Sequence, residues 1–372
     1  MTEIEDWSAE PERFGLDAAA LKRADAIVRA GMDEGVYPAA TYIVLRRGKI
    51  VARNAMGLAQ PHVDPPVATE LTTVFDMASL TKPVAATLLL QMIERGDLHL
   101  GMRVLDLLPE AADAPVGPVT LFQLATHTSG LPAWKPLYMS DLGGAIAEIL
   151  ATELEAQPGT RYAYCDLGYI LIGEIIARRA GVPLDRLAQE RIFAPAGMSR
   201  TGYLPTEDMR GGIAATANCP MREGQTLVGD VHDANAHSMG GVSGHAGLFS
   251  TASDMARFAV ALFHREEATR LGIPPLLRPA ALRLTATRQT DPAVSGHSIG
   301  HFTMPNSMLP KGDLLSSSTF GHTGFTGTLI LHDPEQELTL LLLTNRVWNP
   351  EDGTGIGRIR RLFANAVAGG IV

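Results

Sequence analysis

The chain has 372 residues, of which 46% are hydrophobic and 19% are charged, and its formal net charge is −9. This composition is typical of a folded globular protein and argues against intrinsic disorder. The negative charge argues against nucleic acid and anionic membranes as partners. The length exceeds what one compact core usually holds, so we expect two structural lobes.

The cysteine content and the apolar runs bear on the compartment. Cys165 and Cys219 are too few for a disulfide scaffold in a chain of this size, and we expect both to be free thiols. The sequence begins with an acidic stretch rather than a hydrophobic leader, and no run approaches the ~20 apolar residues of a membrane span. These features predict a cytoplasmic protein.

The first predicted elements in chain order are a helix and a hairpin. The helix begins after Asp17, shows apolar residues at helical spacing and ends before Gly35. Strands are expected at 40–45 and 50–52, joined by a turn that contains a glycine.

The middle of the chain, from about 76 to 295, has a mostly helical pattern interrupted by proline- and glycine-rich loops. Helices are expected at 84–95 and 167–180, and a glycine follows each of them. A third helix is expected at 255–263, after the segment 250–254, which is rich in residues that cap helices.

The C-terminal part again predicts strands, at 327–332 and 338–344, with a turn at 333–336. The last predicted element is a helix at 355–368, whose apolar residues share one face.

Because strands lie at both ends of the chain and helices lie between them, we expect an α+β fold. An antiparallel β-sheet would be flanked by the N- and C-terminal helices, with a mostly helical domain inserted. We place the sheet domain at 1–75 and 296–372 and the inserted domain at 76–295. A functional site would lie at their interface.

The first segment with chemical potential holds Ser79 and Lys82 at a predicted helix start. Residues three apart share one helix face, so the amine can reach the hydroxyl. A serine hydroxyl is a weak nucleophile until a base takes its proton, and a lysine with a lowered pKa can be that base. Taken alone, the spacing is weak evidence, because it is more often that of a capping serine beside a solvated lysine.

The second segment holds Tyr164 and Asp166, just before the predicted helix 167–180. A phenol can serve as a base or a proton relay when a cation lowers its pKa. The structural alternative is a core tyrosine ahead of a packed helix.

The third segment runs from Gly321 to Gly327, at the start of a predicted strand, and holds His322, Thr323, Gly324 and Phe325. Its small residues would let a substrate lie alongside a strand edge. His322 would bring a donor or a positive charge to the pocket. The backbone N–H groups of Phe325 and Ser79 could together hold an oxyanion. The alternative is a glycine-rich start of a strand with a satisfied histidine.

In this order the three segments resemble the motif set of the penicillin-recognising serine hydrolases, S-x-x-K, S-D-N and K-T-G. The closest resemblance is to the branch of class C β-lactamases, family VIII carboxylesterases and DD-peptidases, which carries Y-x-N and often H-T-G in the second and third places. Segments 124–132 and 240–251 also resemble that branch.

The resemblance implies that Ser79 is the acylated nucleophile and that Lys82 is either its base or the cation that tunes Tyr164. Tyr164 would relay the proton to the leaving group and later activate water. His322 would replace the lysine of K-T-G. Substrate contacts would come from Asp166, Thr323 and Gly324.

Asp166 departs from the asparagine that is usual in the second motif. An amide both donates and accepts hydrogen bonds, whereas an ionised carboxylate only accepts them. Asp166 could pair with Lys82 and raise the pKa of that lysine, which would favour a charged lysine and a tyrosine base.

A histidine-rich stretch holds His232, His237 and His245, with Asp230 and Asp233 close by. A metal cluster is conceivable, but no pair shows a known ligand spacing. We interpret the stretch as a polar loop that lines or shapes the cleft, and we expect neither a metal nor another cofactor.

The predicted function is a serine hydrolase that forms an acyl-enzyme at Ser79, as an esterase on short-chain carboxylic esters. The missing leader favours an esterase, and a histidine at position 322 suits a neutral substrate better than a lysine would. The alternatives are a β-lactamase, a peptidase or amidase acting on D-alanyl or other D-amino-acid substrates, and a non-catalytic ligand-binding protein on the same scaffold. The expected partner is a small ester or amide, and the oligomeric state is left open.

Overall fold

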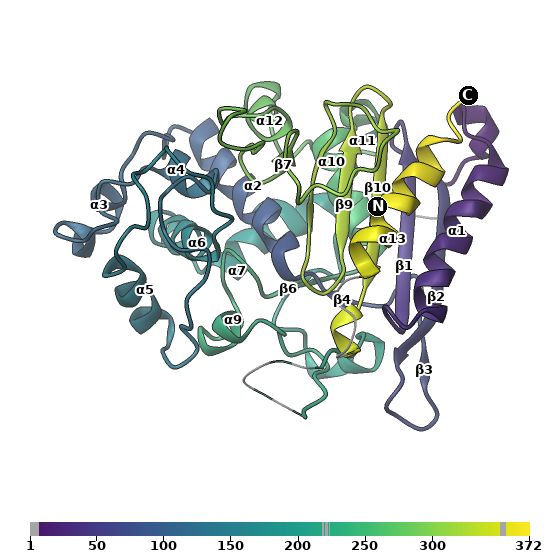
Figure 1. The fold of residues 1–372 in the computed structure, drawn as a ribbon, viewed down its shortest axis with the longest axis horizontal. Coiled ribbons are helices and arrows are strands. Elements are labelled where there is room, and N and C mark those ends of the chain that lie inside the picture. The colour runs from purple at the N-terminus through teal and green to yellow at the C-terminus, as the bar shows by residue number, and fades with distance from the viewer. Residues whose placement is uncertain (1–6, 218, 220–221, 223, 350–354) are drawn as a thin grey trace.

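The computed structural model describes residues 7–217, 219, 222, 224–349 and 355–372. At its centre is an antiparallel sheet with the strand order β3-β2-β1-β10-β9-β8-β7 (Figure 1). Its strands are β1 (Ala39–Arg46), β2 (Lys49–Gln60), β3 (Val67–Ala68), β7 (Phe302–Thr303), β8 (Phe320–Thr323), β9 (Leu329–Asp333) and β10 (Leu338–Thr344).

The middle of this sheet joins the two ends of the sequence, because β1 pairs with β10. Leu340 and Leu342 of β10 pack into a core with the helices α1 (Ala18–Asp33) and α13 (Gly355–Ala368), which lie side by side at one edge of Figure 1. The alternate residues Leu341 and Leu343 face the opposite core. Burial on both faces explains why β10 is a continuous apolar run rather than an alternating one.

The opposite face of the sheet is covered by α10 (Ala252–Phe263), which contacts β1 and β10. Beyond it lies a mostly helical region (Figure 1). Its helices are α2 (Thr81–Glu94), α3 (Val104–Leu107), α4 (Leu121–Ala125), α5 (Leu142–Leu150), α6 (Asp166–Ala180), α7 (Leu184–Ala188), α8 (Ala194–Ala196), α9 (Ala234–Ser238), α11 (Arg265–Arg270) and α12 (Pro279–Ala286).

A second, three-stranded sheet lies between the large sheet and the helices. It has the order β4-β6-β5, formed by β4 (Phe75–Asp76), β6 (Leu248–Ser250) and β5 (Gly202–Tyr203). Strand β4 leads into a single 3-10 turn at Ala78–Leu80 and then into α2. The small sheet therefore fixes the segment that carries Ser79.

The predicted α+β class is confirmed, as are the terminal helices, the antiparallel sheet and the free state of both cysteines, which the structure shows to be buried. The predicted cap at Asp17 is present, since its side chain accepts a hydrogen bond from the Ala19 N–H. The domain bounds 1–75, 296–372 and 76–295 stay a prediction. Helix α10 falls within the segment assigned to the insertion, yet it packs on the sheet.

The structure corrects three expectations about individual elements. Strand β2 continues to Gln60, well past the predicted 50–52, because it pairs with β1 and then with β3. The third motif precedes β9 as expected, but its first residues also form a strand that was not expected, β8, and the rest form the turn between β8 and β9. The strand predicted at 327–332 begins only at Leu329, because Gly327 lies in that turn with φ +106°.

Within the described residues, no helix combines the length and the apolar character that crossing a membrane requires. The cytoplasmic location stays a prediction.

Candidate active site

Ser79 is presented by a tightly held turn between β4 and α2. The turn begins with Ala78, a non-glycine residue at φ +46°, a left-handed conformation that costs free energy. It is stabilised by hydrogen bonds from the Met77 N–H to Leu248 O (2.9 Å) and from the Ala78 N–H to an Asp76 carboxylate oxygen (2.8 Å). These bonds position Ser79 at the wall of a pocket of about 450 Å³.

Lys82 lies in the first turn of α2 and is fully buried. Its Nζ donates to Ser79 Oγ (3.0 Å), to Asp166 Oδ1 (2.7 Å) and to the backbone oxygen of His245 (3.3 Å). An ammonium has three N–H donors, so every one of them has an acceptor. The predicted pairing of Lys82 with Asp166 is confirmed.

This environment keeps the amine charged. Burial alone would lower the pKa of Lys82, but the charge of Asp166, with smaller contributions from hydrogen bonding and from Tyr164, outweighs burial and raises that pKa above its ordinary value. A charged lysine has no lone pair with which to take the Ser79 proton. The geometry therefore favours the mechanism in which Lys82 acts as a cation that tunes Tyr164, rather than as the base that takes the Ser79 proton.

Tyr164 precedes α6 and lines the same pocket as Ser79 and Asp166. Lys82 Nζ lies 4.8 Å from the centroid of its ring. Burial raises the pKa of Tyr164, while Lys82 and, to a smaller degree, a hydrogen bond with Ser79 act in the opposite direction. Because the net pKa is raised, Tyr164 rests as a neutral phenol, which can pass a proton on but is not a preformed phenolate.

The segment from Tyr164 to Asp166 is held in place by His127. The backbone oxygen of His127 accepts from the Ala163 N–H (3.0 Å), and its ring Nδ1 accepts from the Cys165 N–H (3.0 Å). Since Nδ1 accepts, the ring proton must be on Nε2. Burial, followed by the charges of nearby groups, lowers the pKa of His127 well below its ordinary value, which preserves this tautomer.

His322 does not lie where the sequence suggested. It is buried on β8, its ring stacks on Phe302 with centroids 4.4 Å apart, and its ring centroid is 5.8 Å from that of Tyr164. Its Nδ1–H donates to the carbonyl oxygen of Thr323 (2.8 Å), so Nε2 carries a lone pair, and this atom has no partner among the described residues.

The expectation that His322 offers the pocket a donor or a positive charge was therefore wrong. Burial, followed by the charge of Lys82, lowers the pKa of His322 well below its ordinary value. The ring is a neutral group behind Tyr164, and the K-T-G lysine has no charged equivalent at this position.

The turn after β8 brings the predicted substrate contacts to the pocket, which Thr323, Gly324 and Phe325 all line. Gly324 must be a glycine, because a Cβ there would lie 2.6 Å from the backbone oxygen of Met77. The Phe325 N–H makes no hydrogen bond within the described part of the chain. Its pairing with the Ser79 N–H in an oxyanion hole stays a prediction.

Two threonines of this turn bind the nucleophile segment. Thr326 Oγ1 donates to Asp76 O (2.7 Å), and Thr328 Oγ1 donates to Met77 O (3.1 Å). The large sheet and the Ser79 turn are thus joined directly by hydrogen bonds.

Several pocket residues were not singled out by sequence reasoning. Trp134, Met308 and Arg346 line it, and the Arg346 guanidinium lies over the Phe325 ring, 4.6 Å from its centroid. No motif marks these residues. The predicted polar loop does reach the cleft, since His232 and Asp233 line the pocket, and in the described ranges no cluster of side chains suited to a metal ion occurs.

Comparisons with known proteins agree with this geometry. The family model described as Beta-lactamase matches residues 24–365. A protein of Escherichia coli strain K12 named "Putative D-alanyl-D-alanine carboxypeptidase" is 32% identical over 92% of this chain and 86% of its own length. A protein of the same name from Salmonella heidelberg strain SL476 is 31% identical, with the same coverage.

Solved structures agree on the fold. EstCE1, a hydrolase with promiscuous acyltransferase activity, superposes with a TM-score of 0.76 at 21% identity, over 94% of this chain and 98% of its own. The octameric penicillin-binding protein homologue from Pyrococcus abyssi has a TM-score of 0.72 at 21% identity, over 93% of this chain and 76% of its own.

Proposed function

The chain belongs to the beta-lactamase family and is a serine hydrolase, and we propose that it hydrolyses small carboxylic esters through an acyl-enzyme at Ser79. One observation carries the proposal: Ser79 Oγ lies 3.0 Å from a buried lysine amine that is itself paired with a carboxylate. A buried ion pair of this kind at a pocket wall is costly and is typical of a reaction centre.

In the proposed acylation step, Ser79 Oγ attacks the ester carbonyl carbon. The serine proton moves to the oxygen of Tyr164 while the Tyr164 proton moves to the leaving alkoxide, so no resting phenolate is needed. The positive charge of Lys82 stabilises the developing negative charge on the serine oxygen. The N–H groups of Ser79 and Phe325 receive the carbonyl oxygen.

Deacylation reverses this relay. Water attacks the acyl carbon, its proton passes to Tyr164, and the Tyr164 proton returns to Ser79 Oγ. Asp166 keeps Lys82 charged in both steps, because the carboxylate only accepts hydrogen bonds.

The lining of the pocket favours an ester that carries no carboxylate. Trp134, Met308 and Phe325 are among the exposed large apolar side chains of the protein, and all three line this pocket. His322 is a buried neutral ring, so the third motif brings no cation toward a substrate carboxylate. Apolar walls with a few directed polar groups are the usual form of a small-molecule site.

A second candidate is a carboxypeptidase that acts on D-alanyl peptides. The relatives' name points to it, and the Arg346 guanidinium at the pocket wall suits the terminal carboxylate of a peptide.

The test compares p-nitrophenyl acetate and butyrate, nitrocefin and a D-alanyl-D-alanine peptide, each with wild type and Ser79→Ala. We expect turnover of the p-nitrophenyl esters, with kcat reduced by a factor on the order of 10⁴ or more in Ser79→Ala. Release of D-alanine without ester turnover would favour the peptidase, and nitrocefin turnover alone would favour a β-lactamase. Failure of a fluorophosphonate to add to Ser79, as measured by intact mass, would favour an idle binding protein.

A further inference from the structure

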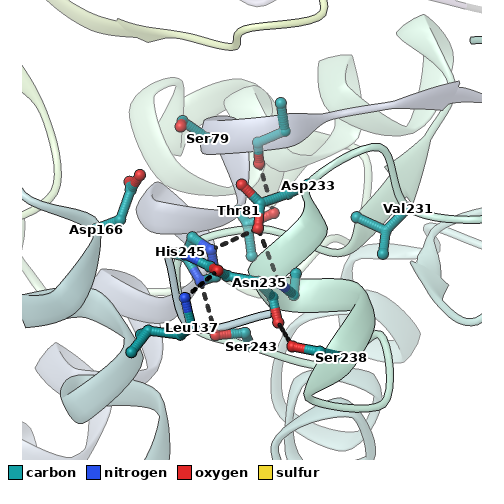
Figure 2. Close-up of polar contacts among 12 residues, drawn as sticks. Ser79, Thr81, Leu137, Asp166, Val231, Asp233, Asn235, Ser238, Ser243 and His245 are labelled. Carbon is teal, nitrogen blue, oxygen red and sulfur yellow. Dashed lines mark hydrogen bonds and ion pairs between the residues drawn. The ribbon is translucent and has the colours of Figure 1, made fainter. Parts of the chain in front are cut away.

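Asp233 places a second carboxylate at the wall of the pocket that holds Ser79. It lies just before α9, in the loop between the small sheet and that helix, and its side chain is 29% exposed. Figure 2 shows Ser79, Asp166 and Asp233 around one space, with His245 beside Asp233 on the side away from Ser79. Asp233 has no place in the proposed acyl transfer.

Within the described residues, only one of the two carboxylate oxygens of Asp233 makes hydrogen bonds. Oδ1 accepts from the Ala236 N–H (2.8 Å), which caps α9, and from His245 Nε2 (3.0 Å). No hydrogen bond is made by Oδ2 with any residue that the structure describes. An asparagine would supply the cap and the bond to His245 equally well, so neither contact requires the negative charge.

The carboxylate is fixed relative to the reaction centre. His245 is buried, and Ser243 Oγ (2.8 Å) holds it on its other ring nitrogen (Figure 2). The backbone oxygen of His245 accepts from Lys82. Burial would raise the pKa of Asp233, but the interaction with His245 outweighs burial and holds that pKa well below its usual range. The side chain is therefore ionised at every working pH.

Lys82, whose charge also lowers the pKa of Asp233, is already balanced by another carboxylate. The ammonium of Lys82 is paired with Asp166 at 2.7 Å, and all its donors have acceptors. Asp233 is a rigid, ionised carboxylate at the wall of a pocket of about 450 Å³, and its Oδ2 makes no hydrogen bond within the described part of the chain. Such a group is suited to bind a protonated amine.

We propose that Asp233 is a specificity residue that binds a protonated amine carried by the substrate, so that the preferred esters are cationic. This inference rests on the proposed function and names the substrate class of the same pocket. The amine can belong to the acyl part or to the alcohol part of the ester, and both place the same ammonium chemistry against Asp233.

The test uses two pairs of esters of nearly equal shape, assayed by pH-stat at a pH where the amines are protonated. The methyl ester of alanine, as both enantiomers, is compared with methyl isobutyrate, in which a methyl group replaces the ammonium. The acetate of 2-(dimethylamino)ethanol is compared with 3-methylbutyl acetate. The quantity measured is the ratio of kcat/KM for the cationic ester to kcat/KM for its neutral partner.

We expect the wild-type ratio to exceed one by about ten-fold or more in at least one pair, the size of one charge-assisted hydrogen bond. Asp233→Asn keeps the cap and the acceptor for His245 but loses the charge, and it should reduce the ratio about ten-fold, whatever its effect on the absolute rates. The matched control Asp230→Asn removes a charge from the same loop outside the pocket, and it should leave the ratio unchanged.

A wild-type ratio near one in both pairs overturns the inference, as does a ratio that Asp233→Asn leaves unchanged. Either result leaves the proposed function standing, provided that the neutral esters are hydrolysed by wild type and not by Ser79→Ala. Hydrolysis of none of the four esters overturns the proposed function and this inference together.

Discussion

Replacing Asp166 by asparagine removes the negative charge that lies 2.7 Å from Lys82 Nζ while keeping an oxygen that can accept the same hydrogen bond. The Lys82 side chain is 0% exposed and that of Asp166 is 20% exposed, so the pair is only weakly screened by water. Removing one partner of a buried pair costs ~3–5 kcal/mol, and the partial exposure of Asp166 favours the lower end. At 1.36 kcal/mol per tenfold, ~3 kcal/mol lowers the proton affinity of Lys82 by about a hundredfold.

The direction in which the pH–rate profile should move follows from the direction of the pKa shift of Lys82. A raised pKa means that the charged lysine stabilises the wild-type fold at every pH below the ordinary lysine value, and that this stability is lost only as the pH rises through the folded-state value. Without Asp166, burial dominates and the proton leaves at a lower pH. The alkaline limb of the pH–rate profile should therefore move to lower pH in Asp166→Asn.

The measurement is kcat/KM for p-nitrophenyl acetate from pH 5 to about pH 11, past the ordinary lysine pKa and corrected for spontaneous hydrolysis, with Asp230→Asn as a control that removes a charge outside the pocket. The free energy of unfolding, followed in urea, should fall by ~3 kcal/mol in Asp166→Asn. An active Asp166→Asn enzyme whose alkaline limb coincides with that of wild type would refute the role of the ion pair.

Three further predictions concern residues around this centre. His127→Asn retains an acceptor at the place where Nδ1 meets the Cys165 N–H, and asparagine tolerates the φ of +57° at this position, whereas His127→Gln places its amide elsewhere. We expect kcat to fall less than about tenfold in His127→Asn and about a hundredfold in His127→Gln. Equal losses in the two variants would contradict the positioning role of His127. Gly324→Ala places a Cβ 2.0 Å from a threonine hydroxyl oxygen. We therefore expect the free energy of unfolding in urea to fall by ~1–3 kcal/mol and kcat/KM to fall clearly. Wild-type values of both quantities would contradict the close approach. Burial lowers the pKa of His297 and of His301 to about 3, against an ordinary value of 6.5. As the pH falls, these histidines are therefore protonated first in the unfolded chain, and stability that is present above pH 6.5 is lost below it. At pH 4.5 each ring costs ~3 kcal/mol, and a melting temperature that stays flat from pH 6.5 to 4.5 would show that these rings are not held neutral.

The sequence predicted those parts of the fold that are encoded locally. The helix 355–368 and the strand 338–344 have the same bounds in the structure, because an amphipathic repeat and an apolar run specify them without reference to the rest of the chain. The short strands β4, β5 and β7 have two residues each and no pattern of their own. They exist because a neighbouring segment supplies their hydrogen-bond partners, which no local window contains.

The site divides in the same way. The contact between Ser79 and Lys82 follows from helical spacing, and the pairing of Lys82 with Asp166 follows from the chemistry of an aspartate in place of an asparagine. The orientation of His322 could not be predicted, because it depends on the stacked ring of Phe302 from another strand. The position of Asp233 at the pocket wall is likewise set by packing, here around His245.

The central sheet pairs β1 with β10, the strands that come first and last in the sequence, and this pairing has a consequence for synthesis of the protein. The Ala39 N–H is satisfied by the side chain of Asn345, 306 positions later. At a translation rate of 5–20 residues per second, the ribosome needs roughly 15–60 s to make the intervening chain. For that time the apolar strand β1 lacks its neighbour β10, so we expect the nascent chain to depend on a chaperone or on cool growth conditions to avoid aggregation. We also expect the cavity around Ser79 to form only after the chain is released from the ribosome.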